Sequence, residues 1–253
     1  MKYNTLRDYE TFLKGSLADS TAVSYRKCVD TLLQDQYLLD CKSLNPDLIL
    51  PKFETMKHKN QYSKYKNAFL KFCEFQGIQL DNDFLLKLNL MKLDKKKKRR
   101  NLKEVDLKDI NNHIRVIRDR KLKVSYQTLL ATGLRVSELS QIQKEDCLID
   151  SNKIELSFIG KGGNPESVSI LKSENKSLYQ NLSTLIYESN EKPFYSANYL
   201  QTNTKGFGCH DLRRAFAKLD YQKNKDLKQT AEKMRHKNKK NTKIYTNSKV
   251  KIK

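Results

Sequence analysis

The sequence predicts a mainly helical protein of two domains with one small antiparallel β-hairpin. Apolar residues recur at helical spacing through residues 1–90 and again after residue 104. A lysine-rich stretch lies between these regions, and near residue 160 the apolar period changes from helical to alternating. We therefore expect a helical domain over residues 1–91, a basic linker over 92–103, and a mixed but mainly helical domain over 104–253.

Residues 1–90 are predicted to be helical throughout. A first helix should end at Gly15, and Ser20 or Thr21 is placed to cap a second. A short segment around residues 50–56 precedes the clearest helix, which should end at Gly77, and one or two further turns are expected over 81–89. The apolar stripes of the three longer helices are Leu6, Tyr9, Phe12 and Leu13; Tyr25, Cys28, Val29, Leu32 and Leu33; and Tyr62, Tyr65, Phe69, Phe72 and Cys73.

The linker carries an unbroken run of positive charge, made of Lys95, Lys96, Lys97, Lys98, Arg99 and Arg100. Like charges at this density resist packing and keep a chain extended. A nuclear-import signal and a plain solvated linker are alternatives for such a run. Because it joins two domains of a basic protein, we favour contact with nucleic-acid phosphates.

The second domain begins with two predicted helices, over residues 107–117 and 124–132, the latter ending at Gly133. Apolar residues then alternate over 154–158 and 168–170, around a turn-rich segment at 160–165, which predicts the hairpin. A helix is expected over 173–189, irregular structure over 191–208, and a further helix from His210 to Leu219.

The charge of the chain points to a polyanionic partner. Fifty Lys and Arg residues against 29 Asp and Glu residues give a net charge of +21, of which residues 91–103 carry +7 and residues 205–253 carry +12. An excess confined to two short segments suits a protein that grips phosphate with a linker and with one active face. A merely soluble basic protein is the alternative.

Several classes of protein are disfavoured by the sequence. The five cysteines are odd in number and never fall in CxxC spacing, so neither a disulfide framework nor a zinc finger is indicated. No signal peptide or membrane span is evident, and we expect a cytoplasmic protein, associated with the nucleoid while bound to DNA. A P-loop, a paired acidic metal site and a His/Cys cluster are also lacking.

Two candidate sites precede the basic C-terminal segment. Arg135 and Glu138 lie three residues apart after a glycine turn, so Glu138 can orient Arg135, although such pairs are more often surface salt bridges. Lys161 stands among glycines at the hairpin tip, where it could protonate a leaving oxygen or simply belong to a turn.

The C-terminal segment holds the richest chemistry. His210 and Arg213 share one helix face; a buried histidine beside a surface arginine is the routine alternative. His236 lies in a setting too polar for a core histidine, and Tyr245 follows nine residues later. Arginines can clamp phosphate oxygens, imidazoles can transfer protons, and a phenol can act as a nucleophile. This combination suits covalent attack on a phosphodiester.

Four blocks of sequence resemble the tyrosine recombinases, also called the phage integrase family. Members read approximately Ala-Thr-Gly-Leu-Arg-x-Ser-Glu-Leu, Gly-Lys-Gly, His-x-Leu-Arg-His and Gly-His-x(8)-Tyr. The corresponding blocks here, in the same order, are residues 131–139, 160–162, 210–214 and 236–245. The resemblance covers residues 104–250 and implies the family's catalytic domain. Residues 1–91 are similar to its core-binding (SAM-like) domain in size and pattern only, and no separate arm-binding domain is expected.

Carried over residue by residue, the resemblance implies a metal-free and ATP-free recombinase. Arg135 and Arg213 would clamp the scissile phosphate, supported by Glu138. Tyr245 would attack phosphorus to give a 3′-phosphotyrosyl bond. Lys161 would be the general acid for the 5′-oxygen. His210 would assist proton transfer at the tyrosine, and His236 would donate a hydrogen bond to the phosphate.

The sequence also departs from the family pattern. Arg235 replaces the glycine before the histidine, and Arg214 replaces the second histidine of its block. The hairpin has Glu166-Ser167-Val168 in place of the Arg-x-Val-Pro that often follows the lysine. Only eight residues follow Tyr245, so we expect the C-terminal docking tail of many relatives to be short here, or the docking to be done otherwise.

The resemblance implies an integrase or resolvase of a mobile element or chromosome. Its partners would be a duplex recombination site with inverted half-sites, further copies of the chain (a dimer on the site, a tetramer in the synapse), and accessory DNA-bending proteins. Two alternatives remain open: a type IB topoisomerase-like nicking-closing enzyme, and a catalytically idle DNA-binding protein of the same fold.

Overall fold

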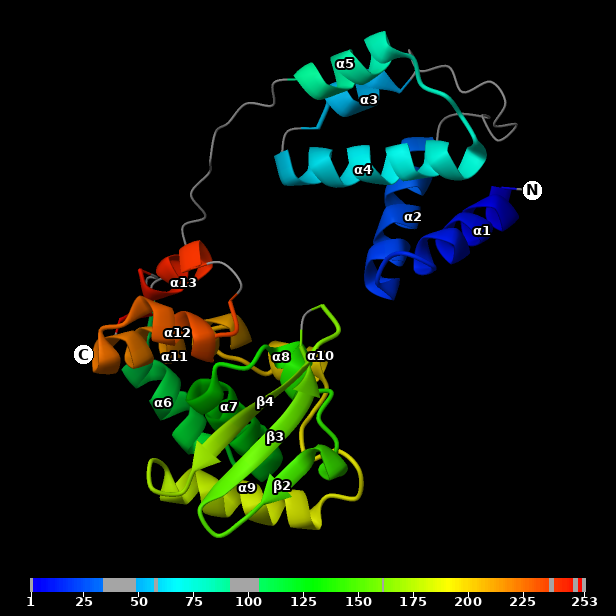
Figure 1. The fold of residues 1–253 in the computed structure, drawn as a ribbon. Helices are drawn as coiled ribbons and strands as arrows, with labels where there is room; N and C mark the ends of the chain where they lie inside the picture. Colours follow the sequence, from blue (N-terminus) through cyan, green and yellow to red (C-terminus); the bar gives the residue numbers. More distant parts are fainter. Residues whose placement is uncertain are drawn as a thin grey trace. The chain divides into compact units, whose positions relative to one another are not determined.

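The computed structural model describes residues 2–33, 49–56, 59–91, 105–160, 162–236, 239–247 and 250–251. Contacts within the chain divide it into two compact units, Met1–Arg99 and Arg100–Lys253. The predicted fold class is confirmed, since both units are mainly helical and the second holds a small antiparallel sheet (Figure 1). The basic run at residues 95–100 and Lys161 lie outside the described residues.

The first unit contains the helices α1 (Lys2–Lys14), α2 (Asp19–Leu33), α3 (Leu50–Glu54), α4 (Lys59–Gln76) and α5 (Asn82–Leu90). Helices α1, α2 and α4 pack against one another, and their predicted apolar stripes form most of one core. Tyr9 lies at its centre, fully buried, with its hydroxyl donating to the Ala68 carbonyl at 2.7 Å. The Phe72 ring meets Tyr9 edge-on at 5.2 Å.

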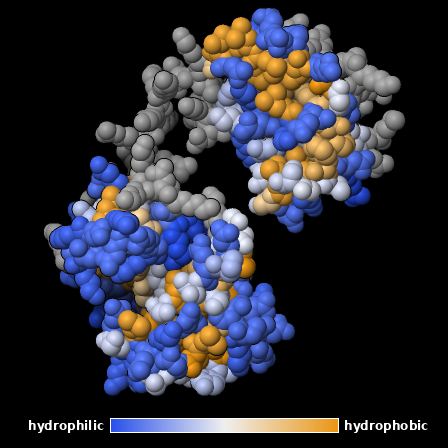
Figure 2. Space-filling view, viewed as in Figure 1, coloured by the Kyte–Doolittle hydropathy of each residue, from blue (hydrophilic) through white to orange (hydrophobic). Residues whose placement is uncertain are grey.

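One detail of this unit differs from the sequence-based expectation. Helix α2 begins at Asp19, one residue before the predicted cap, because the Ala18 carbonyl already accepts from the Thr21 and Ala22 amides. Apolar surface also remains uncovered on α5, where Leu86 and Leu90 are exposed and Figure 2 shows apolar side chains gathered.

The second unit has a three-stranded antiparallel sheet in the order β2-β3-β4, formed by Cys147–Ile149, Lys153–Ile159 and Pro165–Leu171. The predicted hairpin is β3 and β4, with Phe158 opposite Glu166 in the register. Strand β2 was missed because three residues are too few to show an alternating pattern. The apolar face of β3 points into the core, and α9 (Lys176–Glu188) packs against β3 and β4.

The helices of this unit supply the rest of the core and leave the face of the sheet that is turned to the viewer uncovered (Figure 1). They are α6 (Leu107–Val116), α7 (Arg120–Thr132), α8 (Val136–Leu139), α10 (Ala197–Thr202), α11 (Cys209–Asn224), α12 (Leu227–Lys233) and α13 (Lys239–Thr246). Helix α7 contacts α9, α11 and β4. Helix α11 also contacts α12 and α13, so the elements that carry the candidate residues meet around it.

Two further expectations for this unit are corrected. The region predicted to be irregular contains α10, a short helix capped by the Ser196 hydroxyl and anchored by the buried Leu200. Helix α11 extends five residues beyond the predicted end at Leu219, to Asn224. Strand β1 (Val105–Asp106) pairs in parallel with β5 (Val250–Lys251), and this pairing joins the two ends of the unit.

Gly133 ends α7 in a left-handed conformation, with φ of 62°. A Cβ atom at this position would lie 2.3 Å from Cδ1 of Phe216 on α11. We therefore expect Gly133→Ala to lower the free energy of unfolding by about 2–5 kcal/mol, from the left-handed backbone and the clash together. The measurement is a urea titration followed by circular dichroism.

Gly206→Ala is the matched control for this substitution. Gly206 is also left-handed, with φ of 79°, but a Cβ there meets nothing within 4 Å. It should lose only about 1–2 kcal/mol. Equal losses for the two variants would show that the contact between α7 and α11 is not tight at Gly133.

No helix in the described part of the chain is long and apolar enough to cross a membrane.

Candidate active site

Glu138 is the carboxylate around which the site is built. It lies in α8, and its side chain is only 4% exposed. One oxygen accepts from the Arg135 amide at 2.8 Å, and the other accepts from the Arg135 guanidinium. Burial alone would raise the pKa of Glu138, but these hydrogen bonds outweigh it and the pKa is lowered. Glu138 therefore holds Arg135 in place from a buried position. The two residues do not form the surface salt bridge that was the alternative from sequence.

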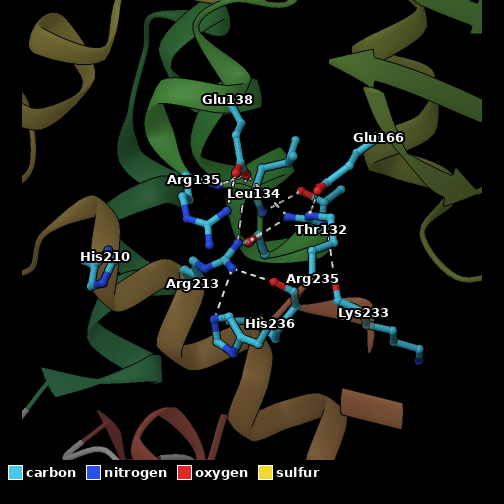
Figure 3. Close-up of polar contacts among 12 residues, drawn as sticks. Thr132, Leu134, Arg135, Glu138, Glu166, His210, Arg213, Lys233, Arg235 and His236 are labelled. Atoms are coloured by element: carbon cyan, nitrogen blue, oxygen red, sulfur yellow. Dashed lines mark hydrogen bonds and ion pairs between the residues drawn. The ribbon is translucent and has the colours of Figure 1, made fainter. Parts of the chain in front are cut away.

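Arg213 is the most buried cation of the site, with 1% of its side chain exposed. Its guanidinium donates to the Gly133 carbonyl and, at 2.6 Å, to the Met234 carbonyl. Burial is the main cause that lowers the pKa of Arg213, to about 10, so the side chain stays charged at neutral pH. The guanidinium thus ties the end of α7 to the end of α12, and Figure 3 shows it beside Arg135.

The burial of His210 and Arg213 is the opposite of the routine alternative, a buried histidine beside a surface arginine. The arginine is buried, whereas the histidine is exposed. Both nevertheless lie beside Tyr245 of α13: its ring centroid is 5.5 Å from that of His210 and 6.0 Å from the Arg213 Cζ. The Tyr245 hydroxyl and His210 Nε2 are 2.7 Å apart, a hydrogen-bond distance. Partial desolvation, followed by the charge of Arg214, lowers the pKa of His210, so a neutral imidazole faces the phenol as a proton acceptor.

His236 is held from both sides of its ring. Nδ1 lies 2.9 Å from the Thr242 hydroxyl and Nε2 lies 3.3 Å from Nη2 of Arg213. Because a guanidinium can only donate, Nε2 must be the unprotonated nitrogen and Nδ1 carries the proton. Burial, reinforced by Arg213 and Arg135, lowers the pKa of His236 to about 4.

The lowered pKa of His236 predicts how stability depends on pH. Between pH 6.5 and 4 the unfolded chain binds a proton that the folded chain does not, so the free energy of unfolding should fall as the pH falls through this window. His210 contributes with the same sign. Urea titrations from pH 7 to 4.5 should give a shallower decline for His236→Asn than for the wild type. Parallel curves would mean that neither burial nor the arginines lower the pKa of this ring in the folded protein.

Arg235 and Glu166 also belong to this cluster, although sequence reasoning marked them only as departures from a pattern. Nη2 of Arg235 lies 3.5 Å from Oε2 of Glu138, and its Nε lies 3.2 Å from Oε2 of Glu166 on β4. Three arginines, Arg135, Arg213 and Arg235, therefore surround Glu138 (Figure 3). Three positive and two negative groups leave this cluster with an excess positive charge that suits an anion such as phosphate.

The structure brings five of the six predicted catalytic residues together. Arg135 comes from the start of α8, His210 and Arg213 from α11, His236 from the segment after α12, and Tyr245 from α13. Thr242, which orients His236, was not predicted, because nothing in its sequence setting marks it. Among the described residues, no group of His, Cys, Asp and Glu side chains could hold a metal ion.

No protein-family model matches the sequence, and comparison with curated proteins finds no relative. Solved structures do share its architecture. A lambda integrase dimer bound to a COC′ core site matches with a TM-score of 0.67 and 16% identity, covering 97% of this chain and 95% of that one. The Tn1549 transposon integrase in complex with transposon right end DNA has a TM-score of 0.59 and 16% identity, covering 96% and 94%.

XerH site-specific recombinase in a post-cleavage complex with palindromic difH substrate is a third such structure. Its TM-score is 0.57 at 15% identity, with 90% of this chain and 74% of that chain covered. The protein therefore has the tyrosine recombinase fold, as the sequence blocks predicted.

Proposed function

We propose that this protein is a site-specific DNA recombinase of the integrase or resolvase type, which cleaves and rejoins duplex DNA through a 3′-phosphotyrosyl intermediate. The observation that carries the proposal is the 2.7 Å contact between the Tyr245 hydroxyl and His210 Nε2, beside the buried Arg213. A nucleophile, a base and a phosphate-binding cation thus meet in a fold that known recombinases share.

In the cleavage step, Tyr245 passes its proton to His210 and its oxygen attacks the scissile phosphorus. The bond from phosphorus to the 5′-oxygen breaks as the bond to the tyrosine oxygen forms. The 5′-oxygen takes a proton and leaves as a hydroxyl. Because the phosphodiester is exchanged and not hydrolysed, the reverse reaction rejoins the strand without ATP.

The arginines stabilise charge on the phosphate during this exchange. Arg135 is partly exposed and can bind a non-bridging oxygen directly, and the buried Arg213 beside it is proposed to complete the clamp. Glu138 fixes the guanidinium of Arg135 in advance. For His236 to donate to the phosphate, its ring must change tautomer. The Thr242 hydroxyl permits this change, because a hydroxyl can either accept from Nδ1 or donate to it.

The general acid and the DNA-binding linker are assigned from the sequence alone. Lys161 is the proposed donor of the proton to the 5′-oxygen, and the run from Lys95 to Arg100 is proposed to contact the DNA backbone. The proposed partners are a duplex with inverted half-sites, accessory DNA-bending proteins, and other copies of this chain. Similar structures support oligomerisation on DNA: the lambda integrase structures include a dimer on a core site and a tetramer on a Holliday junction, the latter with a TM-score of 0.65 and 15% identity.

The test is to trap the covalent intermediate on DNA. The protein is incubated with a pool of nicked duplexes whose sequence is randomised around the nick, so that the 5′-hydroxyl fragment diffuses away after cleavage. Denaturant-resistant adducts are recovered, the linked peptide is mapped, and the DNA is sequenced. We expect linkage at Tyr245 and enrichment of one site with inverted half-sites.

The outcomes separate the alternatives. Adducts with no sequence preference, together with relaxation of supercoils by monomers, would favour a topoisomerase-like enzyme. Specific binding without any adduct would favour a catalytically idle DNA-binding protein. Linkage at a different tyrosine would refute the assigned nucleophile.

A further inference from the structure

Arg235 occupies a backbone position at which glycine is favoured. Helix α12 ends with the Arg235 amide bonded to the Glu232 carbonyl and the His236 amide bonded to the Ala231 carbonyl. These two hydrogen bonds define a Schellman motif, whose left-handed residue is usually glycine. Arg235 adopts that conformation with φ of 54°. A long charged side chain is thereby placed immediately before His236, on a turn that disfavours it.

The Arg235 side chain turns inward from this motif. Only 11% of it is exposed, and its guanidinium lies 5.3 Å from the centre of the Phe158 ring on β3. Its Nη2 reaches the Gly133 carbonyl at 3.4 Å and Glu138 at 3.5 Å. A buried guanidinium is costly to desolvate unless carboxylates compensate for its charge, and Glu138 is already shared with two other arginines.

Glu166 supplies the second carboxylate. It lies on β4 opposite Phe158, and its Oε2 is 3.2 Å from the Arg235 Nε. Its carboxyl group folds back over Gly160, where a Cβ atom would approach it to 2.4 Å. The absence of a side chain at residue 160 therefore gives Glu166 the space to reach Arg235. Both members of this ion pair are residues at which the sequence departs from the family pattern.

We propose that Arg235 and Glu166 are positioning residues that act as one unit: their ion pair fastens the β3–β4 hairpin to the turn that carries His236 and to the carboxylate that holds Arg135. This inference rests on the proposed DNA cleavage. Through the pair, a displacement of the hairpin moves Arg235 and with it Glu138, so the phosphate-binding arginines and the hairpin keep a fixed relative position.

The test measures how fast the full-length variants form the covalent adduct on the nicked site enriched from the random pool, at saturating protein. Glu166→Gln keeps the size of the side chain and removes the charge, so we expect it to bind the site normally and to form the adduct about 10- to 100-fold more slowly. Glu166→Asp retains the charge and should recover part of that loss. In an Arg235→Gly background, adding Glu166→Gln should change the rate less than about twofold, because the partner is already gone.

Glu155→Gln is the matched control. Glu155 lies on β3 of the same sheet and forms an ion pair with Lys153 at 2.7 Å, away from the arginine cluster. The same chemical change there should leave the adduct rate unaltered. If Glu166→Gln cleaves as fast as Glu155→Gln, or if the losses of Glu166→Gln and Arg235→Gly multiply in the double variant, the positioning inference is wrong while the proposed function stands.

A measurement without DNA keeps the inference testable if no adduct ever forms. Arg235 Nε is buried and lies 3.2 Å from Glu166 Oε2 without the geometry of a hydrogen bond. Its hydrogen, followed by nitrogen-15 NMR, should exchange slowly with water in the wild type because the guanidinium is held away from solvent. It should exchange at least about tenfold faster in Glu166→Gln, because loss of the ion pair lets the guanidinium move toward solvent. Equal exchange rates in the two proteins would overturn the pairing. Absence of wild-type adducts with slow exchange would instead overturn only the proposed function.

Discussion

Replacing Tyr245 by phenylalanine is expected to abolish covalent protein–DNA adducts and to leave DNA binding within about twofold of the wild type. The substitution removes one atom, the hydroxyl oxygen that lies 2.7 Å from His210 Nε2. The ring remains, so its contact with His236, at 5.0 Å between centroids, is retained. Because the lost hydrogen bond is exposed to solvent, the free energy of unfolding should change by less than about 0.5 kcal/mol.

The experiment compares adduct yield on the enriched nicked site with binding measured by gel shift. Tyr187→Phe is the matched control, since Tyr187 of α9 is 72% exposed and lies outside the candidate site. That variant should give the wild-type yield. Persistence of adducts at normal yield in Tyr245→Phe would show that another group attacks the phosphorus.

Local patterns explain why most of the helices could be predicted. The stripes through α1, α2 and α4 repeat over several turns, and most of their residues lie in the core of the first unit, although Phe12 is exposed. Strand β2 and helix α10 were not predicted because each is short and each is stabilised by another element, not by a pattern of its own. Strand β2 exists only through its pairing with β3, and α10 is anchored by Leu200, whose carbonyl accepts from Tyr126 of α7 at 2.7 Å.

The candidate site shows a similar limit. The spacing of Arg135 and Glu138 predicts their pairing, because three residues on a helical turn bring the side chains together. No spacing could show that Glu138 also serves Arg213 and Arg235, which follow it by 75 and 97 residues in the sequence. Sequence reasoning recorded Arg235 only as a departure from the family pattern. The Arg235 side chain is buried because the turn after α12 packs against the β3–β4 hairpin, and no local sequence pattern encodes that contact.

Arg213→Lys is expected to slow adduct formation by at least about 10³-fold and to destabilise the second unit. Lysine keeps a positive charge but cannot donate to two carbonyls and a phosphate in the fixed geometry of a guanidinium. Loss of one preorganised donor to a developing oxyanion lowers the rate of the chemical step by about 10²- to 10³-fold. Here the hydrogen bonds to the phosphate and those to the backbone carbonyls are both disturbed. One of the carbonyls, of Gly133 or Met234, is left without its buried donor, which costs about 1–3 kcal/mol of unfolding free energy.

Arg214→Lys is the matched control that distinguishes a slower cleavage step from a lower free energy of unfolding. Arg214 lies on the same helix and forms an ion pair with Asp211 at 2.7 Å, but its side chain is 22% exposed. Arg214→Lys should therefore lose less than about 1 kcal/mol and cleave at nearly the wild-type rate. Rates are compared at a temperature at which circular dichroism shows all variants folded. If folded Arg213→Lys cleaves within tenfold of Arg214→Lys, then Arg213 supports the fold alone, and Arg135 must bind the phosphate without it.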